Sequence, residues 1–288
     1  MADARVLLGR PVARVINDST SERAAEFQSK YNRSPLLAVL VSPDPASESY
    51  LKTIRLNAKK VTSEIREIPI RPDMGLTDLS AQIRSLNDDD TVDGILVQTP
   101  LPEGVKAEQV GRVLDRMKDV DGITPYQSGL LFRGAKHAMI PSTARAVIEI
   151  LDYYRFGLEG LEVIVVGRSL VIGKPVGILA LGRNATVTWC HSKTRGLPGL
   201  CKRAEILIAA IGRANMIDSK YVRPSATVID VGINIDDKGE LVGDVNANDI
   251  KSIATAYTPV PGGVGPVTTA CLFDNLVNAA ILRKSVRS

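Results

Sequence analysis

The sequence predicts an α/β fold of two domains, in which helices cover parallel sheets. The chain has 288 residues, which is enough for two domains of ordinary size. Short apolar runs alternate with segments of helical spacing in two series along the chain, and this alternation is typical of βαβ units. A stretch of weak periodicity, 119–142, contains several Gly and Pro residues and separates the two series.

The first series contains three apolar runs that we expect to be buried strands, each followed by a helix. Parallel strands need a crossover connection, usually a helix, so this order favours a parallel sheet. The expected elements are a strand at 35–41, a helix at 47–61, a strand at 64–70, a helix at 76–87, a strand at 92–98 and a helix near 106–117.

The second series repeats the pattern and predicts a Rossmann-like domain. Its expected elements are a helix at 141–154, a strand at 161–167, a helix from Gly173, strands at 184–190, 205–212 and 226–233, and a last helix at about 266–284. We expect this last helix to pack back on the first domain. The predicted domains are therefore 1–140 together with 267–288, and 141–266.

Composition excludes several classes of function. The net charge is +4 without basic runs, and aromatic residues make up only 4% of the chain, so a nucleic-acid surface is not expected. No apolar run approaches the roughly 18 residues that cross a bilayer, and the N-terminus lacks a signal peptide pattern. Cys190, Cys201 and Cys271 are expected to be buried thiols, which suits a cytoplasmic protein. With two histidines, no metal site is expected.

The first half of the second series carries a dinucleotide-binding signal. An apolar strand runs into a turn at Gly167, and a helix starts near Gly173. Glycine lets the backbone approach a pyrophosphate, and a helix N-terminus offers unpaired N–H groups to it. The two glycines are six residues apart, which is not the standard spacing, so a simple tight connection is the alternative interpretation.

The next strand favours NADP over NAD. NAD-selective folds place a carboxylate about 20 residues after the glycine turn, where it binds the ribose hydroxyls. Here the strand ends in Cys190-His191-Ser192-Lys193-Thr194, without a carboxylate, and Arg168 lies in the glycine turn. Cations and hydroxyls suit a 2′-phosphate. The alternative is that Arg168 and Lys193 are solvated surface charges.

Six segments together resemble the bifunctional methylenetetrahydrofolate dehydrogenase/cyclohydrolase family over nearly the whole chain. They are VDGILVQTPLP, KDVDGITPYQSGLL, VGRSLVIGKP, NATVTWCHSKT, VIDVGIN and TPVPGGVGPVTTA. The resemblance implies two α/β domains with a cleft between them and a homodimer. It also implies that a folate substrate lies against the first domain and that NADP lies against the second.

The resemblance assigns site residues. It implies catalytic roles for Tyr50, Gln98 and Asp121, and Asp121 can accept hydrogen bonds from the amino-pyrimidine ring of a pterin. The implied substrate contacts are Tyr50, Ile54, Val97, Gln98, Thr99, Pro100, Asp121, Pro261, Gly262, Gly263, Val264 and Gly265. The implied NADP contacts are Gly167, Arg168, Ser169, Ser192 and Ile233. Taken singly, Tyr50 could be a packed helix residue, Asp121-Gly122 a turn and the Gly/Pro run a linker.

The sequence departs from the family pattern at one position with a chemical consequence. The family has a Lys four residues after the Tyr, on the same helix face, and this chain has Ile54 there. Lys52 and Arg55 stand two and five residues after Tyr50, so we expect them to point elsewhere. We expect the dehydrogenase activity to be kept and the cyclohydrolase activity to be weak or lost. The alternatives are a fully bifunctional enzyme that forms 10-formyltetrahydrofolate, and a non-catalytic paralogue that binds folate or NADP.

Smaller departures fall on the same predicted cleft. Thr124 and Gln127 replace His and Asn of the family pattern, Ser142 replaces Cys, and Thr99 replaces Leu. These changes indicate an altered folate site or a paralogue with a narrower role, and a shifted substrate is a further alternative.

Overall fold

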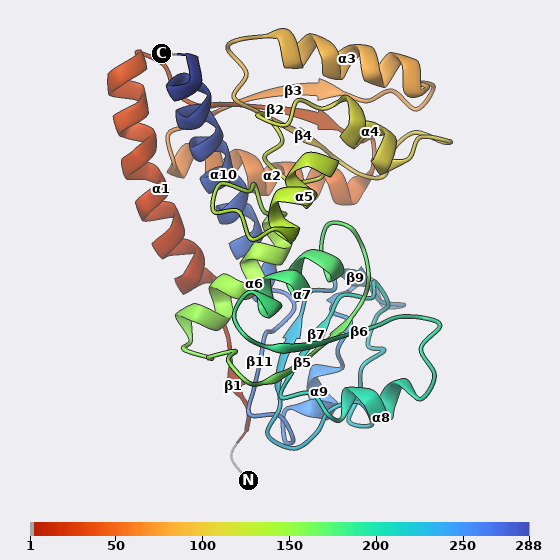
Figure 1. The fold of residues 1–288 in the computed structure, drawn as a ribbon. Coiled ribbons are helices and arrows are strands. Elements are labelled where there is room, and N and C mark those ends of the chain that lie inside the picture. Colours follow the sequence, from red (N-terminus) through yellow and green to blue (C-terminus); the bar gives the residue numbers. More distant parts are fainter. Residues whose placement is uncertain (1–2, 288) are drawn as a thin grey trace. The chain divides into compact units, whose positions relative to one another are not determined.

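The computed structural model describes residues 3–287, and these form two compact units (Figure 1). One unit contains the chain up to Ala13 and Thr143–Thr268, and we call it the six-stranded unit after its sheet. The other contains Arg14–Ser142 and the chain from Thr269 onward, and we call it the three-stranded unit. Two long helices, α1 (Gly9–Tyr31) and α10 (Val264–Arg287), each contribute residues to both units.

The three-stranded unit is built on a parallel sheet of order β3-β2-β4. Its strands are β2 (Leu36–Val41), β3 (Glu64–Pro69) and β4 (Gly94–Val97). Its other helices are α2 (Pro45–Lys60), α3 (Leu76–Asp88), α4 (Ala107–Val113) and α5 (Pro125–Phe132). The central strand β2 is an unbroken apolar run because both of its faces are covered.

Alternate side chains of β2 enter two different apolar cores. Leu37 and Val39 pack in a cluster with α2 and α10, whereas Ala38 and Leu40 pack with α3 and α4. Figure 1 shows α3 on one side of this sheet and α2 and α10 on the other. The period of two along a strand thus sorts one apolar run between two helical layers.

The six-stranded unit contains a parallel sheet of order β1-β11-β8-β7-β5-β6. Its strands are β1 (Arg5–Val6), β5 (Glu162–Val166), β6 (Thr186–Cys190), β7 (Ile206–Ala209), β8 (Thr227–Asp230) and β11 (Ala256–Tyr257). Its helices are α7 (Gly173–Leu181), α8 (Leu197–Cys201), α9 (Ala247–Ile250) and α6 (Ser142–Tyr153), whose first residue belongs to the other unit. A short hairpin, β9 (Asn234–Ile235) and β10 (Leu241–Val242), stands outside the sheet.

The strand order of this sheet contains a switch point beside β5. From β5 the chain goes to β6 on one side and then continues on the other side with β7, β8 and β11. This is the doubly wound, Rossmann-like arrangement, in which ligands bind beyond the carboxyl ends of the strands at the switch point. The predicted two-domain α/β fold is confirmed.

The N-terminal segment groups differently in the contact-based units than in the predicted domains, which place residues 1–13 with the first domain. The described part of this segment belongs to the six-stranded unit, because β1 pairs in parallel with β11 through Arg5 and Ala256. The N–H of Gly9 also donates to the carbonyl of Gly262 at 2.8 Å. Helix α5 is a second difference, since it lies in the stretch that showed little periodicity.

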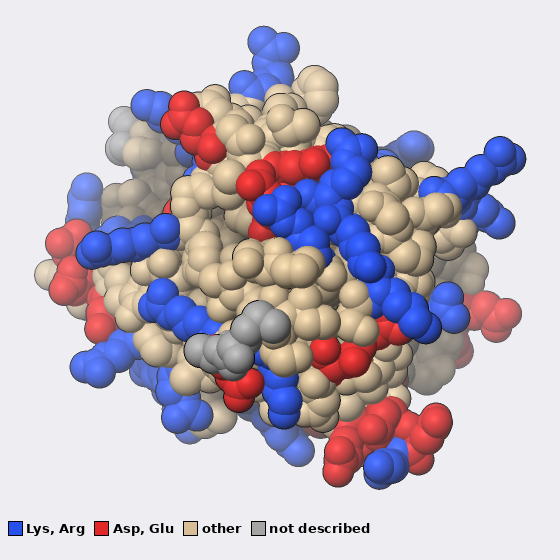
Figure 2. Space-filling view, turned by 90° about the horizontal axis from the view of Figure 1, so that it is seen from below, with Lys and Arg blue, Asp and Glu red and all other residues tan. Residues whose placement is uncertain are grey.

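Surface charge, the cysteines and the helix lengths complete the description of the fold. On the face that Figure 2 draws, acidic and basic side chains are interspersed. Cys190, Cys201 and Cys271 are buried, and they form no disulfide. Within residues 3–287, no helix is long and apolar enough to cross a membrane, and no group of three metal-binding side chains occurs.

Candidate active site

Gln98 links the end of β4 to the β2–α2 connection by hydrogen bonds, at the carboxyl edge of the three-stranded sheet. Its side chain is buried, its Oε1 accepts from the N–H of Ser42 at 3.3 Å, and its Nε2 donates to the carbonyl of Ser47 at 3.1 Å. The hydroxyl of Ser47 donates to the carbonyl of Thr99 at 2.8 Å. The hydroxyl of Ser42 donates to the carbonyl of Pro100 at 2.7 Å. The segment 97–100 is thereby fixed against the start of α2.

Helix α2 presents Tyr50 from this fixed start. Asp44 caps the helix by accepting N–H groups of Ala46 and Ser47, and Pro45 occupies the first turn. The Tyr50 hydroxyl is hydrogen-bonded to the side chain of Thr269. Burial and the neighbouring Asp121 carboxyl raise the pKa of Tyr50 above its usual range. Tyr50 therefore keeps its proton at neutral pH.

Asp121 lies where two chain segments approach closely. Gly122 has a φ of +64°, and a Cβ there would stand 2.8 Å from the nitrogen of Pro141. The buried Asn275 side chain bridges the same two segments, donating to the carbonyls of Val120 at 2.8 Å and Ile140 at 3.0 Å. Glycine is required at 122 by both conformation and space.

The Asp121 carboxyl is shifted toward its neutral form. Burial raises its pKa to about 6, and the nearby Asp119 adds to the rise. Hydrogen bonding from Ser142 acts in the other direction, and the N–H of Ser142 lies 3.4 Å from Asp121 Oδ1. Asp121 is therefore ionised near pH 7 and takes up a proton just below it.

Ile54 occupies the position one helical turn after Tyr50, and it is wholly buried. It packs in the apolar cluster with Leu51, and Tyr50 lies against the same cluster. Lys52 is exposed on another face of α2. Arg55 is engaged elsewhere, with a 3.0 Å bond to Glu48 on its own helix and two 2.7 Å bonds to Glu67 of β3. Neither cation can act as an amine beside Tyr50.

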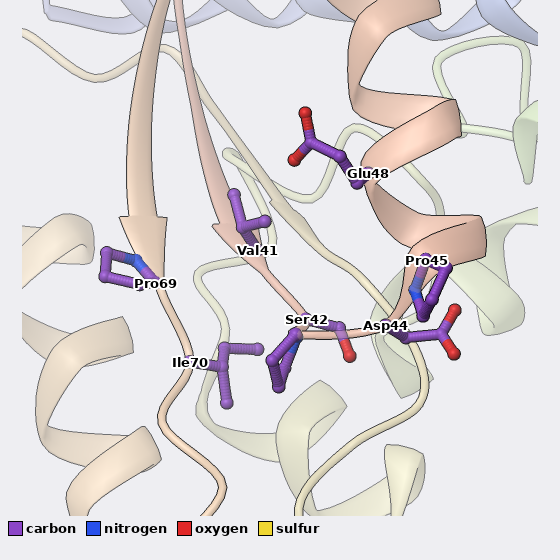
Figure 3. A pocket seen from close by; sticks show the side chains of 8 residues that line it. Val41, Ser42, Asp44, Pro45, Glu48, Pro69 and Ile70 are labelled. Atoms are coloured by element: carbon purple, nitrogen blue, oxygen red, sulfur yellow. The ribbon is translucent and has the colours of Figure 1, made fainter.

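A side pocket opens beside the β2–α2 connection (Figure 3). It has a volume of about 300 Å³, and it is lined by Val41, Ser42, Pro43, Asp44, Pro45, Glu48, Pro69 and Ile70. Its two carboxylates already have partners, since Asp44 caps α2 and Glu48 accepts from Arg55. Tyr50, Gln98 and Asp121 do not line it. The pocket thus borders the loop that Gln98 holds without containing the predicted catalytic groups.

The switch point of the six-stranded sheet carries the predicted dinucleotide turn. Gly167 follows β5 with a φ of +145°, and a Cβ there would overlap the carbonyl of Ala210. A Cβ on Gly173 would stand 2.8 Å from the nitrogen of Arg168. The Ser169 hydroxyl accepts N–H groups of Ile172 at 3.1 Å and Gly173 at 3.3 Å, just before and at the first residue of α7. Only glycine fits at either end of this turn.

The end of β6 lies beside that turn. The N–H of Gly167 donates to the carbonyl of Cys190 at 2.9 Å, which brings Arg168 and Ser192 to one edge. The Ser192 turn is closed by His191, whose Nδ1 accepts the N–H of Lys193 at 3.2 Å. Arg168, Ser192 and Lys193 are exposed there. Ile233 follows β8 at the same edge, with 67% of its surface exposed.

The predicted substrate residues are divided between the two units. Tyr50, Ile54, Asp121 and the segment 97–100 belong to the three-stranded unit. The loop of Pro261, Gly262, Gly263, Val264 and Gly265 belongs to the six-stranded unit, where Gly262 has a φ of +103° and a Cβ on Gly263 would lie 2.5 Å from the carbonyl oxygen of Pro259.

The two halves of the chain match two family models. Residues 7–121 match the catalytic domain of tetrahydrofolate dehydrogenase/cyclohydrolase, and residues 141–284 match its NAD(P)-binding domain. The chain belongs to the tetrahydrofolate dehydrogenase/cyclohydrolase family.

Relatives match over almost the full length. A bifunctional protein FolD of Acidiphilium cryptum is 44% identical over 282 residues, which are 98% of this chain and 99% of that protein. The crystal structure of bifunctional FolD from Campylobacter jejuni is 33% identical with a TM-score of 0.93, covering 97% of this chain and 99% of that one. The Trypanosoma brucei FolD, complexed with NADP cofactor and inhibitor, is 29% identical with a TM-score of 0.92, and both chains are covered completely.

Within this tetrahydrofolate dehydrogenase/cyclohydrolase member, sequence reasoning missed two buried acids of the NAD(P)-binding domain. Asp230 accepts the N–H groups of Gly232, Asp244 and Val245 at 2.9, 3.0 and 2.9 Å. Asp244 accepts three N–H groups of the loop 211–213 at 2.5, 3.1 and 2.8 Å. Burial raises the pKa of Asp230 to about 6. These carboxylates fix the loops beyond β7 and β8, including the one that carries Ile233.

Asp119 is a third missed residue, in the catalytic domain. It is wholly buried and accepts the N–H groups of Ile123 at 3.0 Å and Thr124 at 2.7 Å. It therefore shapes the turn that carries Asp121. The only sequence signal was its place in the segment KDVDG, which by itself is compatible with a simple turn.

Proposed function

We propose that this protein catalyses the NADP-dependent oxidation of 5,10-methylenetetrahydrofolate to 5,10-methenyltetrahydrofolate, and that its cyclohydrolase activity is weak or absent. The observation that carries the proposal is the contrast on one helix face of α2. At the border of an apolar cluster Tyr50 carries a hydroxyl near Asp121 and Thr269, whereas Ile54, one turn later, is wholly buried inside that cluster.

Asp121, Tyr50 and Gln98 divide the work of substrate binding. Above pH 6 the Asp121 carboxylate is ionised and accepts hydrogen bonds from the amino-pyrimidine ring. Tyr50 keeps its proton, so its hydroxyl is a donor to the substrate or an acceptor from it. Both the Oε1 and the Nε2 of Gln98 are hydrogen-bonded to backbone groups. We therefore assign Gln98 to positioning the 97–100 segment and the start of α2.

The dinucleotide edge fits NADP. The glycine turn leaves no room for a Cβ, as a close approach of phosphates requires, and α7 presents its N-terminus beside Ser169. Arg168, Lys193 and Ser192 are exposed at the strand end where a 2′-phosphate would lie, and we assign Arg168 and Ser192 to it. The exposed Ile233 offers an apolar surface for the nicotinamide ring. When bound, NADP supplies the hydride acceptor.

The oxidation step needs no general acid or base from the protein. The methylene carbon between two nitrogens gives up a hydride with both electrons, and the nitrogens delocalise the resulting positive charge. No proton is removed, so the chain has only to position the reacting carbon. The residues described above supply positioning.

The hydrolysis is different, because water must lose a proton and a ring nitrogen must gain one. General acid–base catalysis of such a step is typically worth about 10²–10⁴-fold. Ile54 has no ionisable group, Arg55 is held by Glu48 and Glu67, and Tyr50 holds its proton too tightly to act as a base. We therefore assign this chain the oxidation without efficient hydrolysis.

Two assays on the purified protein test the proposal. NADPH absorbance is followed after mixing methylenetetrahydrofolate with NADP, and the loss of methenyltetrahydrofolate absorbance is followed separately. NADPH formation with hydrolysis near the buffer rate supports the proposal. Hydrolysis comparable to the oxidation would support the fully bifunctional alternative. Absence of both reactions would support a non-catalytic paralogue that binds folate or NADP.

We further propose that the protein is a cytoplasmic homodimer that prefers NADP to NAD. The family resemblance supports the homodimer, and the three buried cysteines, which form no disulfide, suit a reducing compartment. Light scattering after gel filtration measures the mass in solution, and a monomer would contradict the first part. Equal kcat/KM for NAD and NADP would contradict the cofactor preference.

A further inference from the structure

We propose that Ser142 is a positioning residue for Asp121, donating hydrogen bonds that keep this carboxylate ionised and oriented for the substrate. The inference rests on the proposed function, since it assigns Asp121 to the pterin ring. The observation behind it is a buried serine placed against Asp121, the carboxylate that the proposed function assigns to the substrate.

The placement of Ser142 is built into the fold. Its N–H points to Asp121 Oδ1 at 3.4 Å, and only 1% of the residue is exposed. Gly122 permits the close approach of the two segments, and Asn275 bridges them by donating to the carbonyls of Val120 and Ile140. The relationship between Ser142 and Asp121 therefore does not depend on flexible surface chain.

The hydroxyl of Ser142 has one evident use. Among the described residues, its Oγ makes no hydrogen bond of good geometry, although a buried hydroxyl without one costs free energy. The adjacent acceptor is the Asp121 carboxylate, whose pKa is lowered by hydrogen bonding from Ser142. A small rotation of the hydroxyl satisfies both groups when Asp121 is ionised.

Burial and one neighbouring charge oppose the ionisation of Asp121. Burial raises the pKa of Asp121, and the charge of Asp119 raises it further. Tyr50 is neutral and lies near Asp121, and Cys271 and Thr269 face Tyr50 from α10. Ser142 is thus the group that offsets these effects, and without it the carboxylate would be protonated at a higher pH.

The experiment compares Ser142→Ala and Ser142→Cys with the unchanged protein. Because a thiol is a weak donor, the Cys variant should fall between the other two. We expect the acid limb of kcat/KM for methylenetetrahydrofolate to move up by about one pH unit in Ser142→Ala, with an unchanged KM for NADP. Ser80→Ala, at another buried serine, on α3, is the control and should not move the limb.

A second readout does not need activity. In protein labelled with ¹³C at the aspartate carboxyl groups, the Asp121 signal, assigned by its loss in Asp121→Asn, is titrated by NMR. An upward shift of its midpoint in Ser142→Ala supports the inference, even if the oxidation itself were absent. The inference is overturned if Ser142→Ala and the unchanged protein have the same Asp121 midpoint or the same pH profile of kcat/KM. An equal shift in Ser80→Ala would also overturn it. A wild-type protein that fails to oxidise the substrate overturns the proposed function instead.

Discussion

Ile54 follows Tyr50 by one helical turn on α2; Tyr50 packs at the border of an apolar cluster, and Ile54 lies inside it. The Tyr50 hydroxyl lies near Thr269 and Asp121, whereas Ile54 is fully buried among apolar side chains. The Ile54 side chain is therefore shielded from water in the folded protein. An exchange at this position changes both the chemistry and the packing.

Ile54→Lys should increase methenyltetrahydrofolate hydrolysis at least tenfold, because it restores an amine four residues after Tyr50. The new charge in an apolar site should lower the free energy of unfolding by about 2–4 kcal/mol. Hydrolysis and chemical denaturation measure the two effects. Ile54→Met, which has similar length and no charge, is the control and should leave hydrolysis at the buffer rate. An equal gain in the Met variant would show that the amine is not responsible.

Asp121→Asn should raise the KM for methylenetetrahydrofolate by about 10- to 100-fold, because a neutral amide replaces a charged acceptor. The KM for NADP should stay the same, since Asp121 belongs to the three-stranded unit. The acid limb of kcat/KM near pH 6 should disappear. Steady-state kinetics from pH 5 to 8 check this, and a retained limb would assign it to another group.

The same variant should change how stability depends on pH. The pKa of Asp121 is raised to about 6 in the folded protein, above the 3.8 of an ordinary Asp side chain. The ionised form is therefore the less favourable one in the fold, and wild-type stability rises as pH falls from about 6 toward 4. Denaturation should find Asp121→Asn at least as stable as wild type at pH 7.5. That advantage should shrink by pH 5, and one that grew on acidification would contradict the sign.

Arg168→Ala should reduce kcat/KM for NADP by about 10- to 100-fold and change that for NAD little, because a charge-assisted bond to the 2′-phosphate is lost. Comparing saturation with the two cofactors measures the effect. Arg84→Ala, at an exposed arginine of α3, controls for a general loss of positive charge. Equal losses with NAD and NADP would place Arg168 away from the 2′-phosphate.

Lys118→Met should lower the free energy of unfolding by about 3 kcal/mol without changing the KM for NADP. Lys118 is wholly buried, and its Nζ donates to the carbonyls of Leu86, Asn87 and Asp89 at 2.7, 2.6 and 2.7 Å. The Met variant leaves these acceptors at the end of α3 without their donor. Lys60→Met, at an exposed residue, should have little effect. A stable Lys118→Met would show that water satisfies the three carbonyls.

The parts of the fold that follow local pattern could be predicted from the sequence. The apolar run at 35–41 predicts strand β2, and the apolar run before the glycine turn predicts strand β5; the structure has both strands in this order. Strands β1 and β11 could not be found, because each has two residues and their pairing joins positions about 250 residues apart. The contact-based units, which group the described part of residues 1–13 with the six-stranded sheet, rest on this pairing.

In the candidate site, too, residue identities could be read from the sequence, whereas contacts between distant segments could not. The absence of an amine at Ile54 is visible in the sequence, but the engagement of Arg55 depends on Glu67 of a neighbouring strand. Asp119, Asp230 and Asp244 bind backbone N–H groups of loops, and no spacing of residue types encodes such contacts. The contact of Ser142 with Asp121 likewise depends on Gly122 and Asn275, which only the fold brings together.

The central claim is that oxidation and hydrolysis are separated in this chain by Ile54. The most direct test measures both rates on one preparation of purified protein, with methylenetetrahydrofolate and NADP in one cell and methenyltetrahydrofolate in another. The account predicts clear NADPH formation and hydrolysis at least about 100-fold slower than the oxidation. Hydrolysis at a rate similar to the oxidation would contradict it.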